Sequence, residues 1–223
     1  MLVKDEKFRN LYRSLILLNS VNKIKNQKKV SELISNKLKF HKSSIKKNFN
    51  SLLLYPYVDH ERGMLFLVVA TAFIKGKVVK IFNRSAEDDI FTFTRNEIND
   101  IGFVYLDNLK INKNVNLAGH IGYAENILKN HFQNEELESI RMVNSIDGLR
   151  DLNNPDDIWV LFCKGDLHPE KILVKLEELN DGVLSGFILS QPHQDFGINC
   201  GDEIEVILKR DDNNNILGIA KFD

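Results

Sequence analysis

The chain has 223 residues, of which 43% are hydrophobic and 27% charged, and its formal net charge is −1. These values are ordinary for a soluble protein with one large domain or two small ones. No apolar run reaches the roughly 18 residues that a membrane-spanning helix needs, and the N-terminus lacks the apolar segment of a secretory signal. Two cysteines cannot build a disulfide framework, so we expect a cytoplasmic protein.

The charge is unevenly distributed along the chain. Residues 1–50 carry 13 lysines and arginines against 3 aspartates and glutamates, so the remainder is acidic. A basic region of this kind indicates a polyanionic partner such as nucleic acid. The alternative is that the basic region docks on the acidic body of its own chain or of a sister subunit.

The N-terminal part has the spacing of amphipathic helices. Residues 4–25 place apolar side chains three and four positions apart, at Phe8, Leu11, Tyr12, Leu15 and Leu18. A second helix is predicted at 27–38 and a third at 41–53. Together they form an expected basic helical region over residues 1–55.

The middle of the chain changes to strand patterns. Residues 64–74 are apolar on both faces and predict a central strand, followed by a turn at Gly76 and a second strand at 78–82. Two further strands are expected at 90–94 and 101–106. Helical spacing returns at 117–132 and continues at 135–143.

Turn-forming residues at 147–156 suggest a domain boundary, which divides the chain into an α+β domain at 1–150 and a small all-β domain at 151–223. In the second domain, Asp181-Gly182 and Asp211–Asn215 predict two hairpin loops. Residues 169–179 also fit helical spacing, but the Asp-Gly turn favours a strand on each side. The expected fold is α+β: basic N-terminal helices, a central antiparallel sheet with a covering helix, and a C-terminal β meander or SH3-like barrel.

Residues 170–208 of the second domain combine turn glycines, an acidic pair and a strand-ending proline: Leu173-Val174, Glu177-Glu178, Asp181-Gly182, Gly186-Phe187, Pro192 and Gly201-Asp202-Glu203-Ile204. In this pattern the segment resembles a family of small bacterial β domains of unknown function. The resemblance implies a compact β fold found in bacteria, and it implies no reaction.

No set of residues in the sequence has the spacing of a catalytic or metal site. Cys163, His168, His193 and Cys200 include zinc-binding residue types, but their spacing matches no known zinc motif, and Cys163 suits a buried position better. The cluster at 59–61 is expected to lie in a solvated loop, and the glycines at 119 and 122 lack the order of a phosphate-binding loop. We therefore expect no metal and no cofactor.

The basic segment 27–49 can be aligned with a helix-turn-helix. In that alignment Lys42, Lys46 and Lys47 would contact phosphates, and Ser43 and Asn48 would lie near base edges. A plain amphipathic helix pair with lysines on its solvent face gives the same pattern. The leading expectation is a non-catalytic bacterial cytoplasmic protein-interaction protein, similar to an immunity or adaptor protein, which binds a protein partner or itself. The alternatives are a nucleic-acid-binding regulator using 27–49, and an enzyme whose pocket is assembled from distant residues.

Overall fold

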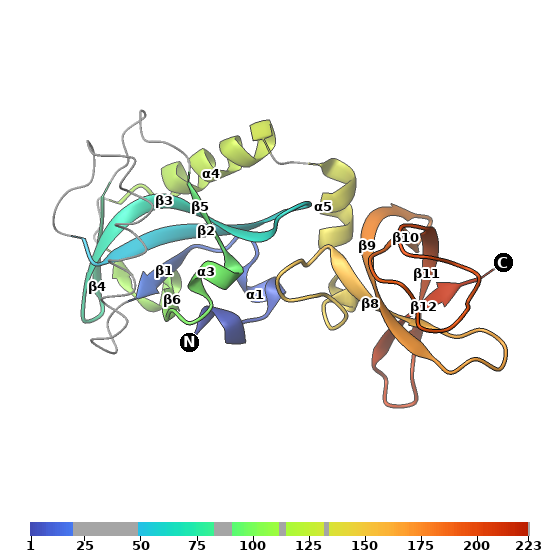
Figure 1. Ribbon diagram of the computed structural model, residues 1–223. Coiled ribbons are helices and arrows are strands. Elements are labelled where there is room, and N and C mark those ends of the chain that lie inside the picture. Colours follow the sequence, from blue (N-terminus) through green and yellow to red (C-terminus); the bar gives the residue numbers. More distant parts are fainter. Residues whose placement is uncertain (20–48, 83–90, 112–114, 132–133, 223) are drawn as a thin grey trace. The chain divides into compact units, whose positions relative to one another are not determined.

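The computed structural model describes residues 1–19, 49–82, 91–111, 115–131 and 134–222 (Figure 1). The chain forms two compact units, residues 1–132 and 133–223. The second unit therefore begins before the boundary expected near residue 150. Each unit has its own core.

The first unit is built on a mixed sheet of seven strands in its described residues. Their order is β6-β1-β2-β3-β4-β7, and β5 pairs with β3. The pairs are antiparallel except for the short β4–β7 pair, which is parallel. The strands are β1 (Ile16–Asn19), β2 (Ser51–Asp59), β3 (Gly63–Lys75), β4 (Val78–Phe82), β5 (Thr92–Thr94), β6 (Phe103–Tyr105) and β7 (Lys110–Ile111).

Strand β3 is the centre of this sheet, as its unbroken apolar sequence predicts. It pairs with β2 along most of its length and forms the expected hairpin with β4 around Gly76, whose φ of 63° suits glycine. The strands predicted at 90–94 and 101–106 are confirmed as β5 and β6. The helix predicted at 117–132 is confirmed as α4 (Leu117–His131).

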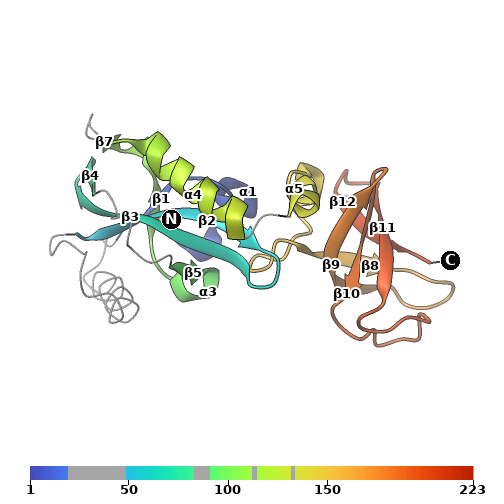
Figure 2. The same ribbon diagram turned by 90° about the horizontal axis from the view of Figure 1, so that it is seen from above.

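Both faces of the sheet are covered. On one face, Ala124, Ile127 and Leu128 of α4 pack onto β2 and β3. On the other face lie η1 (Val3–Asp5), α1 (Phe8–Leu11) and α3 (Arg95–Ile98), so that α4 and α3 are seen on opposite sides of the sheet in Figure 2. The unit also contains η2 (Leu106–Asn108). A sheet covered on both faces needs strands that are apolar on both sides, which is the pattern of β2 and β3.

The predicted helix at 4–25 is wrong over its described residues, 4–19. Only short helical turns form there, and Arg13 adopts a φ of 54°, which ends any helix. Residues 16–19 form β1, paired with both β2 and β6. Pairing on both edges overrides the helical spacing, because Ile16, Leu17 and Leu18 are all buried and a helix would bury only one face.

The third predicted helix, 41–53, is wrong at residues 51–53, which begin β2. The rest of that helix through residue 48, and the second predicted helix at 27–38, lie outside the described residues. The basic N-terminal helices are therefore not part of the fold as described.

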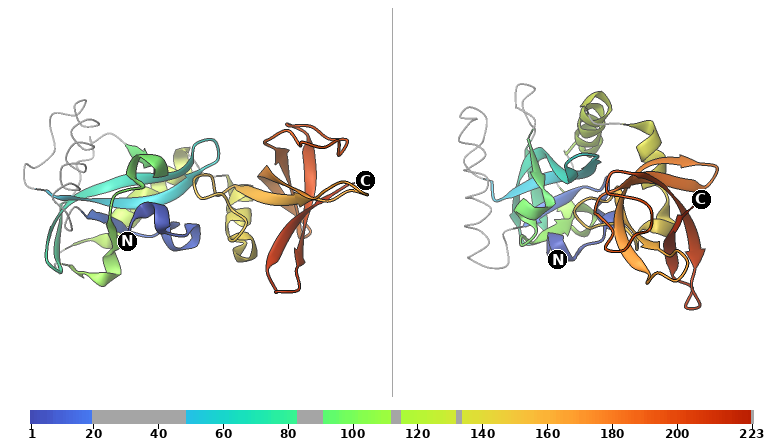
Figure 3. Two further views of the ribbon diagram at one scale, coloured as in Figure 1. Left: turned by 60° about the horizontal axis from the view of Figure 1, so that its bottom comes forward. Right: turned by 45° about the vertical axis from the view of Figure 1, so that its right-hand side comes forward.

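The second unit contains a closed barrel of five strands in the order β10-β11-β12-β8-β9 (Figure 3). Neighbouring strands are antiparallel, and one short parallel pair between β12 and β8 closes the barrel. The strands are β8 (Asp157–Phe162), β9 (Glu170–Asn180), β10 (Val183–Ile188), β11 (Glu203–Arg210) and β12 (Ile216–Lys221). Both predicted hairpins are confirmed, and residues 170–180 form a strand as expected.

Two tight loops join consecutive strands of the barrel as antiparallel neighbours. Asp181 and Gly182 both adopt positive φ, 49° and 83°, which joins β9 directly to β10. Asp211 accepts hydrogen bonds from the main-chain N–H groups of Asn213 and Asn215 and so folds the β11–β12 loop.

Buried arginines fix the segment that leads into the barrel. This segment holds the predicted helix at 135–143, confirmed as α5 (Glu135–Arg141), followed by η3 (Asn144–Ile146). Arg141 is 1% exposed and binds Asp156 through two hydrogen bonds of 2.9 and 2.5 Å. Arg150 donates to the main-chain oxygens of Ile140 and Pro155. These bonds use charged groups to hold the chain in place, and they account for buried arginine without invoking a reaction.

Candidate functional site

The outer surface of the barrel carries large apolar side chains on three adjacent strands. We call Trp159, Leu173, Phe187 and Leu189 the outer wall. Trp159 pairs with Leu173 between β8 and β9, and the N–H of Leu189 donates to the carbonyl of Leu173 at 2.9 Å. The three side chains therefore stand side by side across the strands. Trp159, Phe187 and Leu189 are 44%, 42% and 39% exposed.

Alternation along each strand puts these side chains outside. On β8, Ile158 and Val160 on either side of Trp159 are fully buried in the barrel core. On β10, Ile188 is buried between Phe187 and Leu189. Successive strand residues point to opposite faces, so the wall faces away from the core. Contiguous exposed apolar side chains of this size are uncommon on a protein that binds nothing.

Two lysines share this face. Lys171 and Lys175 lie two residues before and two residues after Leu173 on β9, so their side chains leave the strand on the side of the wall. Lys175 pairs with Phe187 on β10, and Lys171 pairs with Leu161 on β8. The wall is thus apolar in the middle with cationic side chains above and below it.

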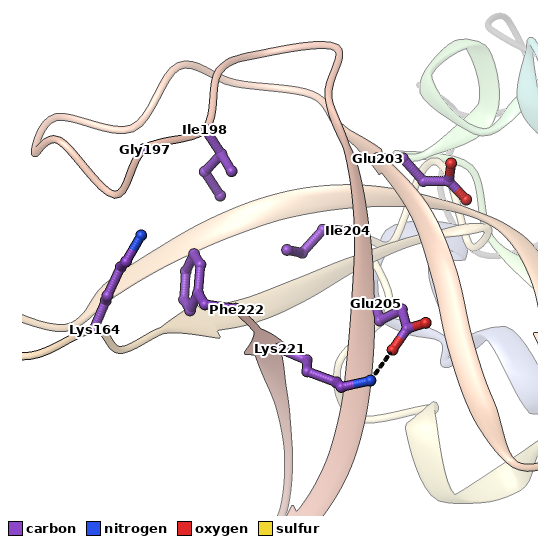
Figure 4. Close-up of a pocket in the computed structure, with 8 residues that line it drawn as sticks. All are labelled: Lys164, Gly197, Ile198, Glu203, Ile204, Glu205, Lys221 and Phe222. Carbon is purple, nitrogen blue, oxygen red and sulfur yellow. Dashed lines mark hydrogen bonds and ion pairs between the residues drawn. The ribbon is translucent and has the colours of Figure 1, made fainter.

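A groove of about 470 Å³ opens elsewhere on the barrel (Figure 4). Ile198, Ile204 and Phe222 face its middle, and Glu203 points its carboxylate away from them. The Lys164 ammonium donates to the Phe196 carbonyl at 2.7 Å and lies 5.2 Å from the Phe222 ring centre.

The remaining charges of the groove form an ion pair. The Lys221 ammonium lies 2.5 Å from the Glu205 carboxylate. Both lysines of the groove therefore have partners within the barrel.

In the first unit, a polar contact ties α4 to the sheet. The Tyr55 hydroxyl donates to the Glu125 carboxylate, and Arg13 lies 3.8 Å from the same carboxylate. Burial, reinforced by the hydrogen bond to Glu125, raises the pKa of Tyr55. A raised pKa keeps the phenol protonated, which suits a structural donor and not a base.

His120 on α4 is 8% exposed, and its Nε2 has no hydrogen-bond partner among the described residues. Burial lowers its pKa, so the imidazole is neutral at neutral pH.

The five residues predicted to contact nucleic acid, Lys42, Ser43, Lys46, Lys47 and Asn48, all lie outside the described residues. The structure therefore gives them no position.

The expected burial of Cys163 is wrong: both cysteines are free and exposed. Cys163 follows β8, where the strand has ended and its side chain is no longer covered. Within the described ranges, no group of three or more His, Cys, Asp or Glu side chains is placed to hold a metal ion.

The other two clusters singled out from the sequence have structural roles. Asp59 accepts hydrogen bonds from the N–H groups of Glu61 and Arg62 and shapes the β2–β3 turn. Gly119 and Gly122 lie within α4, and Asn116 accepts the N–H of Gly119 at the start of that helix.

The outer wall was not singled out from the sequence. The run at 158–163 shows only that a strand is apolar, and a period of two does not say which face is inside. The signal that could have found the wall is that every residue of this run is apolar. A strand with one exposed face needs apolar residues only at alternate positions, so the additional ones point to a second apolar surface.

Comparison of the chain with protein-family models, with curated proteins and with solved structures gives no match. In the described part of the chain, no helix has the length and apolarity required to cross a membrane. The geometry of the two units is therefore the basis for any functional conclusion.

Proposed function

We propose that this protein is a non-catalytic protein-interaction protein of the adaptor or immunity type, and that the outer wall of the barrel is the surface that meets its partner. The single observation that carries the proposal is the exposure of Trp159 on β8 and of Phe187 and Leu189 at the end of β10, the two strands that flank β9. Tryptophan and other large apolar side chains account for much of the binding energy in protein interfaces. Such a surface is apolar and lies on the outside of the barrel, which suits a macromolecule better than a small substrate.

The groove and the buried polar groups support a non-catalytic role. Lys164, Lys221, Tyr55 and Arg141 each have a structural partner, as described above. Their interactions already explain why these residues are charged or polar.

The setting expected from the sequence is part of the same proposal. We infer a bacterial cytoplasmic protein, and the two free cysteines support a reducing compartment. We also propose that the barrel is of the SH3-like type, which its five strands in meander order support. Self-association through the basic N-terminal region and the acidic remainder of the chain is a further form of protein binding within this proposal.

The alternative, a nucleic-acid-binding regulator, depends on residues 27–49. The second unit does not support it, because residues 133–223 carry 8 lysines and arginines against 19 aspartates and glutamates. Such a surface repels a phosphate backbone. Duplex DNA binding that weakens steeply with salt, and that is reduced by alanine at Lys42, Lys46 and Lys47, would establish the alternative instead.

The proposal is tested by affinity purification of the tagged full chain from its source cells under gentle, low-salt conditions. The parent is compared with Trp159→Ser and Leu189→Ser, and Leu152→Ser serves as a control because Leu152 is 51% exposed but lies outside the wall. A specific partner should be recovered with the parent and the control and reduced about tenfold or more with the wall variants.

Two results would count against the proposal. One is recovery of the tagged chain alone from source cells that express this protein normally. The other is a partner whose recovery is the same for the parent and both wall variants, with circular dichroism showing that all four chains are folded.

A further inference from the structure

We propose, building on the protein-interaction function above, that the partner segment bound by the outer wall is an apolar peptide segment carrying a carboxylate, and that this carboxylate pairs with Lys171. The inference concerns the chemistry of the partner, which the apolar side chains of the wall do not specify. Charge around the wall specifies it.

Lys171 is the residue that favours a negative charge on the bound segment. Its side chain is exposed, it stands two residues from Leu173 on the same face of β9, and it makes no hydrogen bond or ion pair within the described part of the chain. An ammonium at the margin of an apolar surface gains most from a carboxylate, because surrounding apolar groups exclude water from the contact.

The remaining charges give the segment a direction. Glu203 on β11 pairs with Phe187 and has no partner among the described residues, so negative charge lies at the Phe187 side of the wall. Lys171 lies at the opposite side, on the far side of Leu173 from Phe187. Lys175 also pairs with Phe187 and offsets Glu203 at that end, whereas Lys171 pairs with the apolar Leu161 of β8. A carboxylate of the bound segment is therefore favoured at the Lys171 end, where no acidic residue lies opposite the lysine.

The charge of the whole unit limits the partner to a segment with few acidic groups. Residues 133–223 carry 19 acidic and 8 basic residues, so a polyanion would be repelled as it approaches. A single carboxylate escapes this repulsion, because salt screens charges more than about 8 Å away while a direct contact with Lys171 is kept. The favoured partner is a protein segment and not a nucleic acid.

The experiment uses the full chain and a library of random peptides displayed on phage. Peptides enriched on the parent chain are then synthesised with a fluorescent label, and their dissociation constants are measured by anisotropy. We expect the enriched sequences to share large apolar residues with an Asp or Glu beside them.

Three variants locate the binding. Trp159→Ser should weaken the enriched peptides about tenfold or more. Lys171→Glu should weaken them about two- to fivefold, and more at low salt. Lys209→Glu is the matched control, because Lys209 is an exposed lysine on β11 that pairs with Leu217 of β12, away from the wall, and the same change of net charge there should have little effect.

A charge exchange completes the test. The acidic residue of the best peptide is replaced by lysine, and this peptide should bind Lys171→Glu more tightly than it binds the parent. Rescue of this kind requires a direct pairing and does not follow from a general change in stability.

The outcomes separate the two proposals. Enriched peptides that need Trp159 but show no acidic preference and no response at Lys171 would overturn the carboxylate inference and leave protein binding by the wall intact. Peptides that bind Trp159→Ser and Leu189→Ser as tightly as they bind the parent would overturn both. A concentration-dependent dimer of the parent that Trp159→Ser abolishes would identify a second copy as the occupant, and would also overturn the inference.

Discussion

Gly186 should be one of the least replaceable residues of the barrel. It lies on β10 at a register shift, opposite Leu176 of β9. A Cβ built at Gly186 would lie 2.0 Å from the Lys175 carbonyl oxygen and 2.8 Å from its carbonyl carbon. Ordinary contacts begin at 3.4 Å, and both atoms belong to the main chain, so no side chain can rotate away. Gly186→Ala must push β9 and β10 apart.

The cost follows from that displacement. Overpacking of a core by a methyl group costs about 1–3 kcal/mol, and each weakened main-chain hydrogen bond adds about 1 kcal/mol. We therefore expect Gly186→Ala to lower the free energy of unfolding by about 3–5 kcal/mol, a large part of the stability of a small domain. With a urea m-value of about 2 kcal/mol/M, the unfolding midpoint should fall by about 2 M.

Tryptophan fluorescence measures this effect in the second unit. The chain has one tryptophan, Trp159, which pairs with Leu173 of β9. Gly148→Ala is the control, because nothing lies within 4 Å of a Cβ at Gly148. The reasoning is refuted if Gly186→Ala unfolds within about 0.3 M of the parent, since the strands would then have absorbed the methyl group without loss.

Two further predictions concern buried polar groups. Arg141→Met removes two hydrogen bonds from the buried Asp156 carboxylate and should cost about 3–5 kcal/mol. Arg141→Met combined with Asp156→Leu should cost clearly less, as the urea midpoints of the two variants will show. Equal losses would mean that Asp156 does not need Arg141. Burial lowers the pKa of His120, so the unfolded chain binds a proton at this residue more readily than the folded chain does. The contribution of His120 to the free energy of unfolding is therefore fully present above about pH 6.5, and it is lost as the pH falls through the lower pKa of the folded state. Circular dichroism of the parent and of His120→Leu in urea at several pH values should show that the substitution weakens this pH dependence; an unchanged dependence would assign it to other groups.

Local signals predicted much of the fold. Asp181-Gly182 and the asparagine-rich loop at 211–215 identified two hairpins, because turn residues act on their nearest neighbours. The long apolar run became the central strand β3, and the helix at 117–132 became α4. The N-terminal prediction failed because the apolar residues 16–18 fit both a helix and a doubly buried strand, and only pairing with β2 and β6 decides between them.

By itself, the amino-acid sequence determined the class of fold, the positions of most turns and the absence of a recognisable reaction motif. Only the tertiary structure decided that the barrel closes through a parallel pair of β12 and β8, and that Trp159, Leu173 and Leu189 meet on its outside. The physical reason is distance along the chain. A turn is set by adjacent residues, whereas strand register and the face that becomes the core depend on contacts between residues far apart in sequence.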